Sequence, residues 1–151
     1  MGNLRLEPMT GEQFVDYRRY TEEHFAQSMI NAGRSEAEAR AEAARSTSGL
    51  LPDGLATPEH HVWTAYDGDL DVGVLWLRIR GTSAFGFDLL VHEHLRRRGY
   101  GRAMMLAAEQ KCREHGVVTI GLHVFAHNPG AVSLYEQMGF TVSSYNMSRT
   151  L

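Results

Sequence analysis

The sequence lacks the features that mark several large classes of protein. Its single cysteine, Cys112, excludes an intrachain disulfide, and a buried thiol is the expected state of that side chain. No apolar run approaches the roughly 20 residues that a membrane-spanning helix needs. The amino-terminal residues lack the hydrophobic region of a signal peptide. We therefore expect a cytoplasmic protein with no membrane partner.

A global excess of positive charge is also missing. The chain has 15 Lys and Arg against 18 Asp and Glu, a net charge of −3, so no nucleic-acid partner is expected. The apolar fraction of 43% and the charged fraction of 22% are ordinary for a globular protein. There is no internal repeat, low-complexity tract or linker, so residues 1–151 are expected to form one domain with its own core.

The most informative segment that is present is rich in arginine and glycine. It lies between a strand-like run at 87–91 and a helix-like run at 104–114. Glycines at such a turn let backbone N–H groups approach an anion closely, and arginines add charge and paired donors that suit phosphate. The segment therefore predicts a cradle for a diphosphate. Its residues are Arg96, Arg97, Arg98, Gly99, Tyr100, Gly101 and Arg102.

Periodicity, capping residues and turn residues predict a mixed order of strands and helices. The first helix is expected to bury a face that includes Phe14, Tyr17, Phe25 and Met29. The predicted order is a strand at 4–6, a helix from near Gly11 to a break at 31–33, a helix at 35–45, a loop at 46–58, strands at 61–66, 72–80 and 85–91, a helix at 99–115, a strand at 117–125, a helix at 128–138 and a strand at 140–147.

This order and the glycine segment together resemble the GNAT superfamily of acyl-CoA-dependent N-acyltransferases. The family's diphosphate motif, Gln/Arg-x-x-Gly-x-Gly/Ala, is matched by Arg96, Gly99 and Gly101. Downstream, Asn128-x-x-Ala131-x-x-Leu134-Tyr135-x-x-x-Gly139-Phe140 resembles the family's second acyl-CoA segment. The resemblance is specific over residues 85–142 and covers only strand order or general layout before that. Glu93 departs from the proline of many members.

The resemblance implies an α/β (α+β) fold of the GNAT type. In that fold a central, mixed and mostly antiparallel sheet of about six or seven strands is flanked by about four helices. Strands 85–91 and 117–125 would splay apart to form the acyl-CoA cleft. Coenzyme A phosphates would sit on the N–H groups of residues 97–102. The pantetheine arm would pair with the backbone of Leu89, Leu90 and Val91, and Asn128 and Ala131 would complete the acyl-CoA site.

Transfer of an acyl group to an amine needs an acid for the leaving thiolate. Tyr135 is the candidate, because family members place their thiolate-protonating tyrosine at this position. It follows Asn128 by two helical turns, so both can face one side of a helix. The alternative is a core tyrosine with a satisfied hydroxyl.

The same reaction needs a base, because a free alkylamine has a pKa of about 10.4 and is protonated at neutral pH. His123 is one candidate, since some GNAT members that act on protein N-termini carry their basic residue here. Asp88, on the strand that faces the acyl group, is the other. Each also has a structural explanation: a strand histidine bonded to backbone, or an aspartate that fixes backbone or a substrate amine. A backbone N–H near Leu90 is expected to bind the oxyanion.

These residues predict an acetyl-CoA-dependent N-acetyltransferase that acts on a primary amine, either a protein or peptide N-terminus or a small molecule. The alternatives are an acyl-CoA-binding regulatory module without turnover and, less consistent with the late glycine loop, a mononucleotide-binding protein. No metal is expected, because the histidine pairs at 60–61 and at 92 and 94 have no third ligand at a suitable spacing. The sequence leaves the acceptor, the acyl length and a homodimer open.

Overall fold

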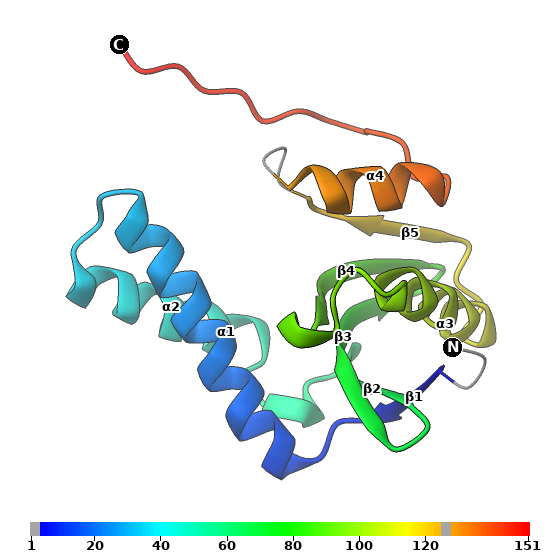
Figure 1. Ribbon diagram of the computed structural model, residues 1–151. Helices are drawn as coiled ribbons and strands as arrows, with labels where there is room; N and C mark the ends of the chain where they lie inside the picture. The colour runs from blue at the N-terminus through cyan, green and yellow to red at the C-terminus, as the bar shows by residue number, and fades with distance from the viewer. Residues whose placement is uncertain (1–3, 125–127) are drawn as a thin grey trace. The chain divides into compact units, whose positions relative to one another are not determined.

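The computed structural model describes residues 4–124 and 128–151 (Figure 1). The chain divides into two compact units, residues 1–121 and 122–151. Within the described ranges, no helix combines the length and the apolar character needed to cross a bilayer.

A five-stranded sheet organises the first unit, with the strands in sequence order from β1 to β5. The first three neighbouring pairs are antiparallel, and the turn residues Gly68 and Gly81 both have the positive φ that tight turns require. The predicted hairpins are thereby confirmed. The strands are β1 (Leu4–Pro8), β2 (His60–Asp67), β3 (Leu70–Arg80), β4 (Ser83–Val91) and β5 (Thr119–Leu122).

Capping residues set the helix boundaries, as the sequence predicts. Thr10 and Gln13 form a reciprocal capping box at the start of α1 (Gly11–Asn31), and Ser35 caps α2 (Glu36–Leu50). The third long helix, α3 (Tyr100–Glu114), is followed by Gly116 at φ +74°. Short 3₁₀ turns, η1 (Gly54–Ala56) and η2 (Glu93–Leu95), complete the helical elements of this unit.

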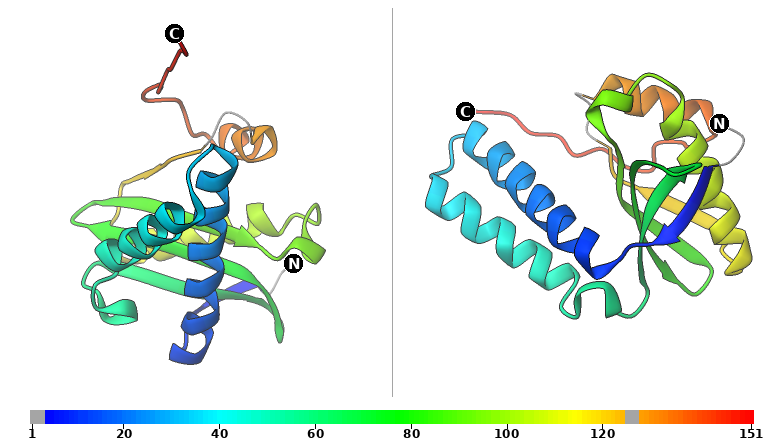
Figure 2. Two further views of the ribbon diagram at one scale, coloured as in Figure 1. Left: turned by 90° about the vertical axis from the view of Figure 1, so that its left-hand side faces the viewer. Right: turned by 60° about the horizontal axis from the view of Figure 1, so that its bottom comes forward.

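The sheet of the first unit buries both of its faces (Figure 2). One face packs on α3 through a core that includes Leu75, Met104 and Cys112, so the predicted burial of the cysteine is confirmed. The other face packs on the first half of α1 through a core that includes Tyr17 and Trp76. Two separate hydrophobic cores therefore hold β3 and β4 between layers of helix.

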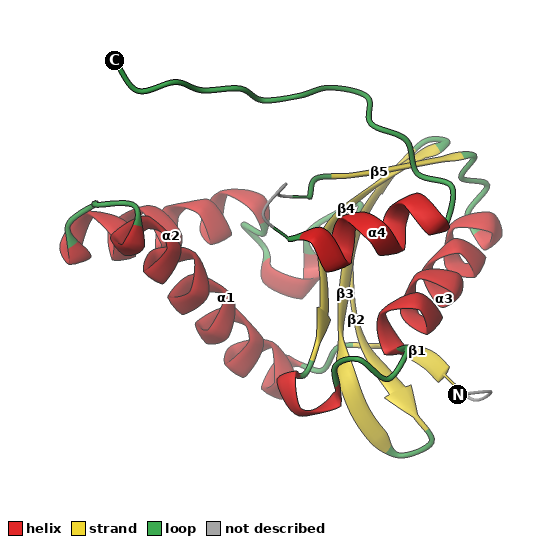
Figure 3. Cartoon of the chain, turned by 45° about the horizontal axis from the view of Figure 1, so that its top comes forward, coloured by secondary structure: helices red, strands yellow, loops and turns green. Residues whose placement is uncertain are grey.

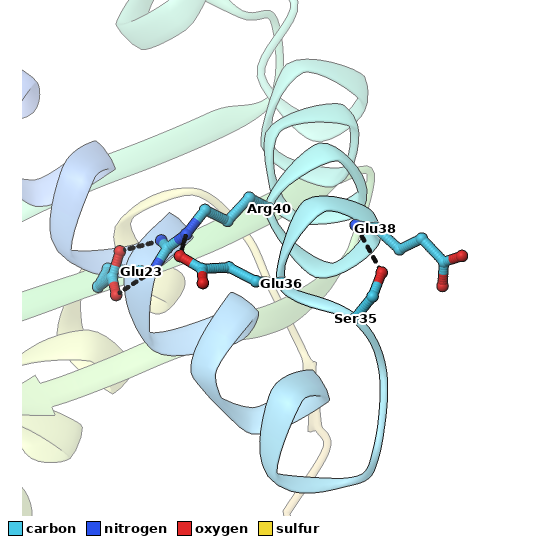
Figure 4. Close-up of polar contacts among 5 residues, drawn as sticks. All are labelled: Glu23, Ser35, Glu36, Glu38 and Arg40. Carbon is cyan, nitrogen blue, oxygen red and sulfur yellow. Dashed lines mark hydrogen bonds and ion pairs between the residues drawn. The ribbon is translucent and has the colours of Figure 1, made fainter.

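The far end of α1 packs on α2 rather than on the sheet. Ala26, Ala39 and Ala43 form a small separate cluster in which the side chains are almost completely buried. Arg40 of α2 donates to both carboxylate oxygens of Glu23 on α1 and pairs with Glu36 on its own helix (Figure 4). Small side chains let the two helices approach closely, and exposed ion pairs add only modest stability.

Two predicted burial or boundary assignments in the first half of the chain are wrong. Phe25 is 43% exposed, because it lies one residue before Ala26 and so points about 100° away from the buried side of α1. The second helix continues to Leu50 instead of ending near residue 45, since Thr47 is buried on it and donates its hydroxyl to the carbonyl of Ala43.

Two strand predictions also need correction. Of the strand predicted at 117–125, Thr119–Leu122 forms β5, whereas residues 117, 118, 123 and 124 lie outside it and residue 125 is not among the described residues. The N–H of Val117 is bonded to the Cys112 carbonyl as part of the end of α3. The segment predicted as a strand at 140–147 has no regular structure (Figure 3). Apolar residues such as Val142 alternate there, but alternation yields a strand only where a neighbouring strand completes the ladder. The described sheet therefore has five strands rather than six or seven.

The described residues of the second unit form one helix, α4 (Pro129–Gln137). Asn128 caps it by accepting a hydrogen bond from the Ala131 N–H at 3.3 Å, and proline occupies the first turn, as predicted. The N–H of Phe140 bonds to the Tyr135 carbonyl at 3.0 Å, and the rings of these two residues pack edge to face at 5.6 Å. These contacts fix the side of α4 on which Tyr135 lies within this unit.

Gly73 marks the closest approach between β3 and β4. A Cβ placed at residue 73 would lie 1.9 Å from the carbonyl oxygen of Leu90, which is backbone and cannot rotate away. We therefore expect Gly73→Ala to lower the free energy of unfolding by about 3 kcal/mol, as measured by urea denaturation. Gly49→Ala is the control. A Cβ there meets nothing within 4 Å on a helix, so that variant should gain up to about 1 kcal/mol. Equal effects would contradict this account.

Candidate active site

Strand β4 carries an irregularity at the point where the sequence predicts chemistry. Trp76 of β3 pairs with Asp88, but the next residue, Leu77, pairs with Gly86, so Phe87 is an extra residue on β4. Such a bulge bends a strand and re-aims the side chains beside it. Phe87 packs into the core on the α1 side, and Asp88 also points toward α1. Two consecutive side chains therefore share one face of the sheet.

The hydrogen bonds between β3 and β4 determine which N–H and C=O groups of β4 are left to bind a ligand. The His92 N–H bonds to the Val72 carbonyl, which makes that pair a hydrogen-bonded one. Because such pairs alternate in antiparallel sheets, the backbone of Leu90 also faces β3, while the backbones of Leu89 and Val91 face away from it. Of the three residues expected to pair with a pantetheine arm, only Leu89 and Val91 thus present polar groups outward.

Two of these outward groups already interact within the protein. The N–H of Leu89 forms a backbone hydrogen bond to the Asp88 carboxyl, which lowers the pKa of that group. The carbonyl oxygen of Val91 accepts a hydrogen bond of 2.9 Å from Nε of Arg96. This bond ties the end of β4 to the start of the arginine-rich segment and leaves the N–H of Val91 directed away from β3. An oxyanion donor near residue 90 is therefore better assigned to Val91 than to Leu90, whose N–H belongs to the sheet.

The arginine-rich segment has the backbone geometry of an anion site. Arg97 has φ +65° and Gly99 has φ +86°, with one residue of ordinary φ between them. Left-handed residues that alternate with right-handed ones turn successive N–H groups toward one point. Helix α3 begins at Tyr100, and Gly99 gives it no side-chain cap, so the first-turn amides have no partner within the helix.

Arginine side chains surround these amides. Arg96, Arg97, Arg98 and Arg102 are exposed, and among the described residues none of the four has a carboxylate within 4.0 Å. Tyr100 differs, because its side chain is buried and its hydroxyl donates to Asp67 at 2.8 Å. That bond raises the pKa of Tyr100. The predicted role of Tyr100 in binding phosphate is therefore restricted to its backbone N–H.

Asp88 is the titratable group at the bulge. Its Oδ2 accepts a hydrogen bond of 2.6 Å from the hydroxyl of Tyr17, which lies on the buried side of α1. Burial raises the pKa of Asp88, whereas the Tyr17 bond, the nearby His24 and the Leu89 N–H act in the opposite direction. The net result is a carboxyl group whose pKa lies above its usual range.

The hydrogen-bond partner of Asp88 is itself strongly perturbed. Burial and then the charge of Asp88 raise the pKa of Tyr17 far above its ordinary value. The phenol therefore stays protonated and acts only as a donor. Sequence reasoning placed Tyr17 in the core without linking it to Asp88, since the two residues are 71 positions apart. One signal in the sequence was available, because a tyrosine on an apolar helix face needs a hydrogen-bond partner for its hydroxyl when it is buried.

The remaining predicted site residues belong to the second unit. His123 is exposed and lies one residue beyond β5. The prediction that His123 is a strand residue is therefore wrong. Tyr135 is half-buried on α4. The side-chain oxygen of Asn128 accepts a hydrogen bond from the N–H of Ala131, so this oxygen caps the start of α4. The functions expected of these residues remain predictions.

Histidines in the first unit have protein partners. Nε2 of His92 lies 2.8 Å from Asp71, and Nδ1 of His60 accepts a hydrogen bond from the Trp76 indole at 2.9 Å. In the parts of the chain that are described, no three His, Cys, Asp or Glu side chains lie together as a metal site would need.

Comparisons with known proteins bear on the family and the fold of this chain. The profile of the Acetyltransferase (GNAT) family matches residues 17–140. The uncharacterized N-acetyltransferase YycN of Bacillus subtilis is 37% identical over 98% of this chain and 99% of its own length. Its crystal structure has a TM-score of 0.91 to this chain over 99% of both, at 36% identity.

More distant proteins share the fold. The PaiA N-acetyltransferase of Thermoplasma acidophilum, solved in complex with coenzyme A, has a TM-score of 0.65 at 18% identity, over 95% of this chain and 93% of its own. The [ribosomal protein bS18]-alanine N-acetyltransferase of Escherichia coli is 37% identical over 54 residues, 36% of each chain. The profile match and the full-length similarity to YycN show that this chain belongs to the GNAT acetyltransferase family.

Proposed function

We propose that the protein is an acetyl-CoA-dependent N-acetyltransferase that moves an acetyl group directly to a primary amine. The observation that carries the proposal is the cradle at residues 96–102, where left-handed φ angles at Arg97 and Gly99 precede an uncapped helix start. Amides that the described part of the chain leaves without a backbone partner, beside four exposed arginines, fit a diphosphate. The adjoining strand β4 presents backbone groups of Leu89 and Val91 that suit the amide-bearing arm of coenzyme A.

The chain's residues would divide the binding between them. The amides of residues 97–102 and the arginine side chains hold the phosphates, Leu89 and Val91 orient the arm, and Asn128 and Ala131 contribute from the second acyl-CoA segment. When bound, acetyl-CoA supplies an acetyl group activated as a thioester. The N–H of Val91 stabilises negative charge on the acyl oxygen during transfer.

We assign the general base to Asp88 and keep His123 as the alternative. The acceptor must lose a proton before its nitrogen can attack, and Asp88 lies on the strand that presents the outward backbone. Burial raises the pKa of Asp88, which moves this carboxyl closer to the pH at which a base works well. Tyr135 is assigned as the acid that protonates the sulfur, on the strength of its place in the second motif.

The acceptor is a primary amine, and a peptide N-terminus is the first kind to examine. The partial similarity to the E. coli enzyme named for an alanine of bS18 supports that choice. The deciding experiment is an acetyl-CoA turnover screen over small amines and short peptides, read by released thiol. Coenzyme A binding without thiol release from any member would instead support a regulatory module.

Gly99→Ala tests the cradle. Alanine resists a φ of +86°, so the backbone should leave the geometry that aims the amides, and the Kd for coenzyme A by calorimetry should rise about tenfold. Gly116→Ala is the matched control, because it imposes similar strain, about 1–2 kcal/mol, at the other end of α3. Similar Kd values for the two variants would count against the cradle.

Asp88→Asn tests the base. We expect kcat/KM to fall by about two to four decades, with little change in coenzyme A affinity. In the unmodified protein the base form is lost as pH falls through the raised pKa of Asp88, so the acidic limb should lie above the usual carboxyl range. His123→Ala should retain this limb. If the acidic limb of the pH–rate profile is lost in His123→Ala but retained in Asp88→Asn, His123 is the general base instead.

Tyr135→Phe tests the acid. Removal of the hydroxyl should lower kcat by about one to three decades while acetyl-CoA affinity changes little, because only proton delivery is lost. Steady-state kinetics and calorimetry on the same preparation separate the two effects. Unchanged turnover would remove the acid role from Tyr135.

A further inference from the structure

Arg78 of β3 is a half-buried arginine without an anionic partner. Its guanidinium carbon lies 5.6 Å from the centre of the Phe87 ring and 6.0 Å from the centre of the Phe85 ring. Across residues 4–124 and 128–151, no carboxylate lies within 4.0 Å of Arg78, and its side chain makes no hydrogen bond. A guanidinium carries several N–H donors in a rigid fork, so this one retains the capacity to bind an anion.

A carboxylate close to Arg78 is committed to another residue. Both oxygens of Glu59 accept hydrogen bonds from Arg80, at distances between 3.0 and 3.3 Å. These bonds are the main reason that the pKa of Glu59 is lowered, and the charge of Arg78 adds a smaller effect. Glu59 therefore lies near Arg78 without forming an ion pair with it.

The imidazole of His60 supplies a second donor beside Arg78. The two residues are directly paired between β2 and β3, so their side chains lie on the same face of the sheet. The indole N–H of Trp76 can only donate, so Nδ1 of His60 accepts that bond of 2.9 Å and the ring proton of the neutral imidazole lies on Nε2. Burial and the charge of Arg78 lower the pKa of His60, which favours this neutral form. Among the described residues, Nε2 has no hydrogen-bond partner.

Aromatic rings form the surroundings of these two donors. The ring of Phe87 stacks on Trp76 at 4.9 Å and meets Phe85 edge to face at 5.2 Å. Gly121 of β5 leaves space on the far side, where a Cβ would lie 3.6 Å from the Phe85 ring. Rings beside a guanidinium restrict its motion and displace water, and both effects strengthen hydrogen bonds from the guanidinium to an anion.

The donors lie on the same face of the sheet as Asp88, the proposed base. Trp76 pairs with Asp88, and Arg78 follows Trp76 by two residues on β3. The two backbone positions are therefore about 7 Å apart along the strand direction. Trp76 and Phe87 belong to the core on the α1 side and lie between them. This separation suits a molecule whose amine and anionic group are several bonds apart.

We propose that Arg78 and His60 form a subsite that binds a carboxylate group of the acceptor. This inference rests on the proposed function and narrows the acceptor to amines that also carry a carboxylate several bonds from the nitrogen. The planar guanidinium matches both oxygens of a carboxylate, and the Nε2–H of His60 adds a further donor. A short peptide and a small amino acid with a terminal amine both have this chemistry, and the experiments below separate them.

Butyrate tests the subsite directly. Sodium butyrate is the probe, butyramide is its neutral counterpart, and binding is read from the indole ¹H–¹⁵N resonances of the two tryptophans. We expect a saturable shift of the Trp76 resonance with butyrate only, because the Trp76 N–H is bonded to His60. Trp63 is the internal reference, since it lies in the core on the α3 side. Absence of a saturable shift at Trp76 would overturn the proposal.

Arg78→Gln removes the charge, so butyrate should bind about tenfold more weakly. Arg5→Gln is the matched control. Arg5 also lies over an aromatic ring, 4.9 Å from the centre of Tyr66, but it is paired with Glu7 at 3.1 Å. This control should bind butyrate as the unmodified protein does. Equal affinity in Arg78→Gln and the unmodified protein would contradict the proposal.

His60→Asn tests the second donor. The asparagine oxygen can accept the Trp76 N–H in place of Nδ1, but asparagine has no group in the position of Nε2. We expect about threefold weaker butyrate binding, because one neutral donor is lost. Butyrate binding as tight as in the unmodified protein would remove His60 from the subsite.

Turnover identifies the source of the carboxylate. We compare kcat/KM for glycylglycine with that for its amide, and kcat/KM for γ-aminobutyrate with that for its amide, by released thiol. An acid preference of about tenfold in the first pair indicates a peptide acceptor, and in the second pair a small amino acid. Arg78→Gln should abolish the preference and Arg5→Gln should retain it.

Two outcomes separate this subsite from the proposed function. Acetylation without an acid preference in either pair would overturn the role of the subsite in acceptor binding and leave the proposed function standing. Butyrate binding without acetylation of any amine would refute the proposed function and leave the carboxylate subsite standing, because the binding readout needs no turnover.

Discussion

The extra residue in β4 is the constraint on which the rest of the site depends. A regular strand would send Phe87 and Asp88 to opposite faces of the sheet. With the bulge, both side chains lie on the α1 face, while Leu89 and Val91 pack toward α3. One short segment can therefore offer a carboxyl group to one layer and outward backbone groups at its edge. Gly73 is required opposite this segment, since the Leu90 carbonyl occupies the space of a side chain.

Burial and hydrogen bonding act on Asp88 in opposite directions, and their balance sets its chemistry. Burial alone would raise the pKa of the Asp88 carboxyl further above its usual range. The Tyr17 hydroxyl partly restores the ionised form without a positive charge that would repel an ammonium ligand. A lysine or arginine in place of Tyr17 would neutralise the carboxylate and remove its attraction for an amine. A neutral donor is thus the partner that suits the proposed role of Asp88 as a base.

Local signals in the sequence predicted much of the fold. The capping box at Thr10, the turn at Gly68 and the Asn128–Pro129 start of α4 each act within a few residues, so they could be recognised without tertiary information. The arginine-rich motif likewise predicted an anion cradle and the family. The strand at 140–147 failed because a strand needs a partner that the alternation of apolar residues does not supply.

The missed parts of the site arise from contacts between distant segments. Neither the Tyr17–Asp88 bond nor the bulge has a local signature, because each depends on how α1 and β3 meet β4. The outward direction of the Val91 backbone depends on the strand register, which a sequence does not specify to one residue. The sequence analysis assigned both the backbone and the side chain of Tyr100 to the cradle. The fold shows that the side-chain hydroxyl instead donates a hydrogen bond to Asp67.

The small contact area between the far half of α1 and α2 affects both local motion and tolerance to substitution. Three buried alanines, the partly buried Met29 and Ile30 and exposed ion pairs hold this helical hairpin, whereas the near half of α1 is anchored in a larger core. The free energy of local opening at the far ends of these two helices should thus be well below the free energy of global unfolding. Substitutions there would be tolerated without loss of the sheet, so the surface of this hairpin can vary while the Asp88 carboxyl group stays fixed.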